Sequence, residues 1–191
     1  MPVIEPHGNS ARIKASAAEL GFSFDRHETR NRIQALCFEL EGPTKLRLLL
    51  ARSGEISLET APLPPPQEGV ADCIALPLPV EPGDWRLRHK TTDRGFYQEA
   101  LAIAQAHGAR DAVFVREDGL VTEGTYTNVF VERGGVLLTP RADLGLLPGI
   151  LRGELIAEGR AEEAELTLAD LANGFFIGNA LRGLIAARLT Q

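Results

Sequence analysis

The chain has 191 residues, 44% of them hydrophobic, and its 26 acidic and 20 basic side chains give a net charge of -6. This composition supports one domain or two small ones with a substantial core, and it argues against disorder. The acidic balance argues against nucleic acids and anionic membranes as partners. No apolar run reaches the roughly 18 residues that span a bilayer, and residues 1–14 lack the pattern of a signal peptide. We therefore expect a cytoplasmic protein.

Two cysteines, Cys37 and Cys73, show neither C-x-x-C spacing nor a nearby pair of histidines. Such isolated thiols are typical of reduced and mostly buried side chains. We therefore predict no disulfide framework and no metal site.

Helix and hairpin patterns occupy the first part of the chain. Helix formers at 9–20 end on a glycine, and apolar residues recur at helical spacing within 27–42. The pair Ser53-Gly54 separates two apolar runs and predicts a hairpin. A further strand within 70–80 contains prolines, which favour a position at the edge of a sheet.

The sequence "EPGD" at 81–84 interrupts this pattern and suggests a small N-terminal domain at 1–82 and a larger domain at 83–191. Beyond it we expect, in order, a strand at 85–90, a helix at about 94–107, strands at 111–118, 125–133 and 136–140, a helix from 149 or 150 to 159, a short strand and a helical turn within 161–174, and strands at 175–179 and 183–189. Gly134-Gly135 joins two of these strands in a hairpin. The predicted fold class is therefore α+β with a mixed or antiparallel sheet.

Lys90 is one of three lysines in a chain with seventeen arginines, and it ends the predicted strand "WRLRHK". Strand alternation would put it on one face with Arg86 and Arg88. Crowded cations lower the pKa of a lysine amine, and Schiff-base chemistry needs the neutral amine. The alternative is a solvated cationic strand face.

Glu123 stands just before Gly124, at the entry to a predicted buried strand. A carboxylate at that position is either an ordinary turn residue or a partner for the protonated ring nitrogen of a cofactor.

Pro148-Gly149 precedes a predicted helix, so the amides of Ile150 and Leu151 would be unpaired donors at a helix N-terminus, which suits a phosphate group. In "FFIGNALRG", Gly178 allows close approach of a ligand to the backbone, and Arg182 could meet a carboxylate. A plain tight turn is the alternative there.

The order and spacing of these signals resemble the class IV, fold-type IV enzymes dependent on pyridoxal 5'-phosphate (PLP). This family includes branched-chain and D-amino-acid aminotransferases and 4-amino-4-deoxychorismate lyase. The motifs are "HKTTDR", "DAVFVREDGLVTEGTYTNVFV", "LLTPRADLGLLPGILR" and "FFIGNALRGLIAARL", which span Lys90 to Leu189. A fainter match is "HGNSARIKASAAELGF". The resemblance implies a small α/β domain, here shortened, and a larger pseudo-barrel α+β domain. It also implies a homodimer that acts on a small amino-acid-type substrate.

The resemblance also implies roles for single residues. Lys90 would bind the PLP aldehyde as an imine and move the α-proton of the substrate, and Glu123 would pair with the pyridine nitrogen. The other assignments are Arg12, Gly149, Ile150, Leu151 and Asn179 at the phosphate, Asn128 in support, and Asn179, Ala180 and Arg182 at the substrate carboxylate. Aminotransferases of the family often carry a tyrosine five residues after the lysine, where this chain has Gly95. The nearest tyrosine is Tyr97, which we assign to the cofactor site.

Two further departures from the family pattern leave the reaction open. Leu151 replaces a threonine that assists the phosphate in many members, and the chain lacks the "G..FET" segment that usually precedes "HGNSARIKAS". Either the small domain is trimmed or residues before Met1 are missing. The leading interpretation is an aminodeoxychorismate lyase, which releases 4-aminobenzoate and pyruvate in folate biosynthesis. The alternatives are a class IV aminotransferase for a small, branched-chain or D-amino acid, and a non-catalytic relative that binds PLP.

Overall fold

The computed structural model describes residues 7–190, with side chains from residue 10 onward. Residues 1–6, on which the prediction about a signal peptide partly rests, lie outside the described part. The chain divides into two compact units, residues 1–66 and 67–191, and each is described by itself.

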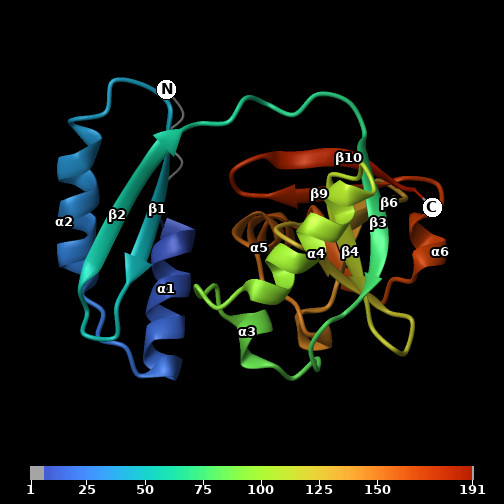
Figure 1. Cartoon of the computed structure of the whole chain (residues 1–191), viewed down its shortest axis with the longest axis horizontal. Coiled ribbons are helices and arrows are strands. Elements are labelled where there is room, and N and C mark those ends of the chain that lie inside the picture. The colour runs from blue at the N-terminus through green and yellow to red at the C-terminus, as the bar shows by residue number, and fades with distance from the viewer. Residues whose placement is uncertain (1–6, 191) are drawn as a thin grey trace. The chain divides into compact units, whose positions relative to one another are not determined.

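The described part of the N-terminal unit contains two helices and a hairpin, as predicted (Figure 1). These elements are α1 (His7–Leu20), α2 (Arg26–Cys37), β1 (Thr44–Leu50) and β2 (Ile56–Pro62). Asp25 caps α2 by accepting the amides of His27 and Glu28, which satisfies two of the four unpaired donors at that helix start. Gly54 takes a φ of +95° in the turn between the antiparallel strands, a conformation that glycine adopts without steric cost.

The C-terminal unit is a mixed sheet with helices packed against it. Its elements are β3 (Ala71–Pro77), α3 (Trp85–Arg88), α4 (Gly95–Ala106), β4 (Asp111–Val115), β5 (Val121–Gly124), β6 (Asn128–Arg133), β7 (Val136–Pro140), the 3-10 turn η1 (Ala142–Leu144), α5 (Ile150–Ala157), β8 (Ala161–Ala164), α6 (Leu168–Leu171), β9 (Phe175–Asn179) and β10 (Gly183–Leu189). The strand order is β5-β4-β3-β10-β9-β6-β7-β8, and β5 also pairs with β6. Six strands therefore close into a ring, and β7 and β8 extend from it. This is the pseudo-barrel α+β fold that we expected.

The alternation of side chains along the strands builds two apolar layers. Cys73 of β3 and Val113 of β4 lie in one large cluster with Val129 and Ile177. Their neighbours in sequence point the other way, where Ile74 and Ala112 pack against Ala104 of α4. Helix α4 thus covers β3 and β4. The chain continues from β4 into the segments that form the candidate active site.

The predicted strand at 85–90 is wrong, because Trp85–Arg88 forms the short helix α3. Asp84 starts this helix by accepting the amide of Arg86, and it also binds the Arg86 guanidinium at 2.7 Å. Asp93 lies 3.6 Å from the same guanidinium. Arg86 therefore pairs with acidic side chains. The predicted strand face that would carry Arg86, Arg88 and Lys90 does not form.

The predicted edge position of the strand within 70–80 is also wrong. Strand β3 pairs in parallel with both β4 and β10 in the middle of the sheet. Its proline, Pro77, is the last residue of the strand, so its missing N–H removes no bond from the strand interior. The compact units consequently divide between Pro66 and Gln67 rather than between residues 82 and 83.

Both cysteines are free thiols, but only Cys73 is buried, whereas Cys37 at the end of α2 is exposed. Burial raises the pKa of Cys73 to about 12. In residues 7–190, no helix combines the length and the apolar character needed to cross a membrane.

Candidate active site

Glu123 of β5 is a buried carboxyl group, with 3% of its surface exposed. The hydroxyl of Tyr97, in the first turn of α4, donates a hydrogen bond of 2.5 Å to Oε1 of Glu123. Burial raises the pKa of Glu123 to about 8, opposed by the hydrogen bonds from Tyr97 and the amide of Leu147 and by the charge of Arg94. Glu123 is therefore a core carboxyl group with directed donors and not an ordinary turn residue.

Arg94 lies against the ring of Tyr97. Its Cζ atom is 3.7 Å from the ring centroid, a distance at which the cation attracts the negative face of the ring. Its Nη2 atom donates to the carbonyl of Thr125 at 3.4 Å, and its Nη1 atom is buried without a hydrogen-bond partner among the described residues. The guanidinium thus links the start of α4 to the turn that follows Glu123.

Asp111 of β4 holds that turn between β5 and β6. Its carboxylate accepts the amide of Thr125 at 2.9 Å and the hydroxyls of Thr125 and Thr127 at 2.6 and 2.7 Å. A side-chain carbon on Gly124 would lie 2.6 Å from Oδ2 of Asp111, so glycine is the residue that fits. Burial raises the pKa of Asp111, and the threonine bonds oppose this effect. The turn brings Glu123 opposite Asn128 in the β5–β6 pair.

Asn128 connects Glu123 to the start of α5. Its Nδ2 atom donates to the carbonyl of Leu147 at 3.0 Å, and the amide of Leu147 is a donor to Glu123. A side-chain carbon on Gly149 would stand 2.1 Å from Oδ1 of Asn128. The backbone of α5 therefore begins in direct contact with the strand pair that carries Glu123.

The first turn of α5 has, in the predicted place, amide donors that the helix itself does not pair. Gly149 is the N-cap and provides no side-chain cap, and its carbonyl accepts the first helical bond, from Gly153. The amides of Ile150 and Leu151 precede that bond, so the helix itself does not satisfy them. A side-chain carbon on Gly178 would lie 3.0 Å from Leu151, which places this turn against β9. These amides and the helix dipole suit a phosphate group.

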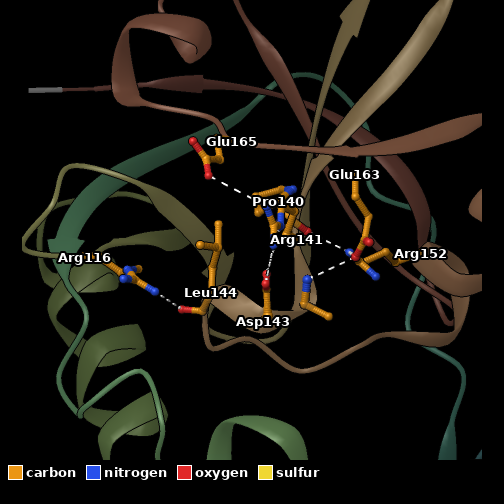
Figure 2. Close-up of polar contacts among 9 residues, drawn as sticks. Arg116, Pro140, Arg141, Asp143, Leu144, Arg152, Glu163 and Glu165 are labelled. Carbon is orange, nitrogen blue, oxygen red and sulfur yellow. Dashed lines mark hydrogen bonds and ion pairs between the residues drawn. The ribbon is translucent and has the colours of Figure 1, made fainter.

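A buried arginine ties α5 to β7 and β8. Arg152 donates to the carbonyl of Pro140 at 2.7 Å and pairs with Glu163, whose Oε1 also accepts the amide of Ala142 (Figure 2). Arg116, which follows β4, donates to the carbonyl of Leu144 at 3.0 Å, in the loop between β7 and α5. These bonds fix the loop between β7 and α5, which contains Leu147 and Gly149.

Asn179 and Arg182 lie at the turn between β9 and β10. Oδ1 of Asn179 accepts the amides of Leu181 and Arg182, each at 3.0 Å, and its Nδ2 atom donates to the carbonyl of Tyr126 at 3.2 Å. The Arg182 guanidinium lies 5.8 Å from the centroid of the Tyr126 ring. Asn179 thus shapes its own turn, and the predicted contacts of Asn179, Ala180 and Arg182 with phosphate or substrate stay predictions.

Lys90 is the only lysine in residues 67–191. It is exposed, and it follows the buried His89 in the segment that leads to Arg94. Arg12 is half-buried on α1 in the N-terminal unit. The roles predicted for both residues stay predictions.

Three parts of the site were not predicted from the sequence, namely Arg94, Asp111 and the backbone of Leu147. The threonines of "TEGTYTN" are a weak signal for a buried acceptor such as Asp111. No sequence pattern indicates Leu147, because it acts through its amide and carbonyl. In the structure the hydroxyl of Tyr97 donates to Glu123, and its predicted place at the cofactor stays a prediction.

The family model described as amino-transferase class IV matches residues 7–189. The chain belongs to the class IV aminotransferase family. This is a family of enzymes that includes aminotransferases and lyases, and its fold is the fold-type IV architecture. The predicted family and fold are confirmed.

Three class IV relatives illustrate the similarity. A "Putative amino-acid aminotransferase" from Mesorhizobium loti, whose crystal structure is known, is 39% identical with a TM-score of 0.89, and the match covers 96% of this chain and 91% of that chain. The "Putative aminodeoxychorismate lyase" of Schizosaccharomyces pombe is 27% identical over 85% of this chain and 71% of its own length. A hypothetical aminotransferase from Mycobacterium tuberculosis in a PLP-bound form is 22% identical with a TM-score of 0.80, over 96% of this chain and 75% of that chain, and shows the shared fold.

Proposed function

We propose that this class IV chain binds PLP in the C-terminal unit and acts as a lyase on aminodeoxychorismate. The observation that carries the proposal is the series of contacts from Glu123 through Asn128 and Leu147 to Gly149. It joins a buried carboxyl group to a helix N-terminus that offers free amides. In PLP, one ring carbon separates the ring nitrogen from the carbon that bears the phosphate arm, so the cofactor needs an acid and a phosphate site close together.

The residues of this chain would divide the work as follows. The amides of Ile150 and Leu151 would hold the phosphate. Glu123 keeps a proton on the ring nitrogen. Bound PLP supplies an electron sink for the α-carbon of an amino acid. Lys90 would hold the cofactor through its amine and would move the α-proton of the substrate.

The substrate side of the site is the turn between β9 and β10. The backbone of Asn179 and Ala180 and the guanidinium of Arg182 would face the substrate carboxylate. Aminodeoxychorismate carries two carboxylates, so a cation at this turn suits it. The lyase reaction releases 4-aminobenzoate and leaves pyruvate. Support for it comes from the relative of Schizosaccharomyces pombe and from Gly95, which replaces the tyrosine frequent in aminotransferases.

An aminotransferase is the second candidate, and the Mesorhizobium loti relative favours it through its 39% identity. The two reactions share removal of the α-proton and differ in what leaves afterwards. Incubation with aminodeoxychorismate, and separately with a panel of amino acids and 2-oxoglutarate, distinguishes them. Pyruvate and 4-aminobenzoate from the first mixture support the lyase. Glutamate from the second mixture, without pyruvate from the first, would establish the aminotransferase instead.

Binding of PLP has its own test. The protein with PLP should absorb at roughly 400–430 nm, and borohydride should fix the cofactor on the peptide that contains Lys90. Lys90→Ala should lose both signals. Lys45→Ala, on an exposed position of β1, is the matched control and should keep them. A band that survives in Lys90→Ala would refute the assignment of this lysine, and a protein that binds PLP without turnover would be the non-catalytic relative.

We also propose a cytoplasmic homodimer, by analogy with the family. Light scattering that reports a monomer at micromolar concentration would contradict the dimer.

A further inference from the structure

Tyr97 is held rigidly. Its side chain is 3% exposed, and its ring lies between three groups. The centroid of Phe96 is 4.2 Å away, that of Phe114 is 5.8 Å away in an edge-on arrangement, and the Cζ atom of Arg94 is 3.7 Å away. A tyrosine packed in this way has little rotameric freedom, so its hydroxyl has one direction. That direction leads to Oε1 of Glu123.

The hydroxyl of Tyr97 occupies only part of the hydrogen-bond acceptor capacity of Glu123. A carboxylate offers about four lone-pair positions, and Tyr97 and the amide of Leu147 use two of them. Acceptor capacity therefore remains for a further donor. Among the titratable and charged groups, Tyr97 and Arg94 favour the Glu123 anion, and Asp111 disfavours it together with burial.

We propose that Tyr97 is a positioning residue that holds the carboxylate of Glu123 through its hydroxyl, with Arg94 stacked on its ring, so that Glu123 presents an anion to the cofactor nitrogen. The last clause rests on the proposed function, whereas the hydrogen bond does not. Arg94 supplies positive charge without itself occupying a lone pair of Glu123. This arrangement gives Tyr97 a task other than the contact with the cofactor that its place in the sequence suggested.

The first test uses the protein without added cofactor. The chain has two tyrosines, so Tyr97→Phe has a matched control in Tyr126→Phe, whose hydroxyl donates to the carbonyl of Arg110 at 3.4 Å. Carbon-13 NMR of labelled glutamate, with the Glu123 signal assigned through Glu123→Gln, follows the titration of that carboxyl. Tyr97→Phe should move it to higher pH, because a donor to the anion is lost. Tyr126→Phe should leave it in place. An unchanged titration in Tyr97→Phe would overturn the proposal.

The second test separates positioning from packing. PLP and its 1-deaza analogue, in which a C–H group replaces the ring nitrogen, are compared as ligands. Tyr97→Phe should weaken PLP about tenfold, the worth of one hydrogen bond to a charged group, and should not weaken the analogue. Equal losses for both ligands would mean that Tyr97 only packs, which would overturn the proposal. If the unmodified protein binds neither ligand, the proposed function fails, while the NMR titration still decides the role of Tyr97.

Arg94→Gln is a second variant that keeps the proposal testable if Tyr97→Phe folds poorly. It removes a charge that favours the Glu123 anion and leaves the tyrosine hydroxyl in place. The titration of Glu123 should again move to higher pH, by less than in Tyr97→Phe. A move to lower pH would contradict the arrangement.

Discussion

The amide oxygen of Asn128 lies 2.1 Å from the point where a side-chain carbon of residue 149 would stand. Gly149 has a φ of -68°, which any residue can adopt. Glycine is therefore needed at this position for space and not for backbone freedom. The Asn128 side chain of β6 therefore packs directly against the backbone at the start of α5. This contact brings the predicted phosphate donors, the amides of Ile150 and Leu151, toward the Glu123 carboxyl.

Gly149→Ala should force Asn128 or the helix start to move. We expect a loss of about 1–3 kcal/mol in the free energy of unfolding, as for other overpacked sites, and PLP affinity lower by at least about tenfold. Denaturant unfolding and a titration of PLP absorbance measure the two effects. Gly153→Ala, one turn later with open space around it, is the control. It should gain about 0.5–1 kcal/mol because alanine favours a helix interior. Equal behaviour of the two variants would contradict the steric argument.

Stability should fall as pH rises, through Glu123. Its carboxyl has an ordinary pKa of 4.5 and a pKa of about 8 in the folded protein. Between these values the folded state holds a proton that the unfolded state has released, so rising pH favours unfolding by at most about 1.4 kcal/mol per pH unit. Glu123→Gln removes this contribution. The difference in unfolding free energy between the variant and the unmodified protein, measured in urea from pH 5 to 8, should grow in favour of the variant. A difference that stays constant would show that Glu123 titrates normally.

Asp111→Asn should destabilise the turn between β5 and β6. The carboxylate accepts two threonine hydroxyls and the amides of Ala112 and Thr125, and an amide group would set a donor against some of these donors. We expect a loss of about 2–3 kcal/mol. Asp72→Asn is the control, because Asp72 forms a surface pair with Arg188 and such pairs contribute at most about 1 kcal/mol. Thermal unfolding of both variants checks the contrast.

Arg152→Met should loosen the attachment of α5. It leaves the carbonyl of Pro140 and the carboxylate of Glu163 without their partner. We expect a cost of about 1–3 kcal/mol, less than for a fully buried pair, since the side chain of Glu163 is 45% exposed. Arg160→Met breaks an exposed pair with Glu158 and should cost at most about 0.5 kcal/mol. Equal costs, measured by urea unfolding, would show that the pair with Glu163 behaves as a surface contact.

Local patterns predicted most of the elements. Helices α1, α2, α4 and α5, the hairpin at Gly54 and strands β7, β9 and β10 lie where their periodicity and turn residues indicate. The failure at 85–90 has a local cause, because alternating polar and apolar residues over six positions fit one short helical turn as well as a strand. Asp84 decides between them by capping the helix. The failure at β3 has a distant cause, since a strand becomes central only through partners, and β10 lies more than a hundred residues later in the chain.

The sequence by itself determined the family and the single lysine of residues 67–191, because both can be read from residue types and their spacing. Only the tertiary structure decided what surrounds Glu123. Tyr97, Asn128 and the amide of Leu147 come from three separate segments. Ring closure between β5 and β6 brings them together, and burial then raises the pKa of the carboxyl that they hold. Desolvation and hydrogen bonding depend on which segments meet, and the order of residues along the chain does not contain that information.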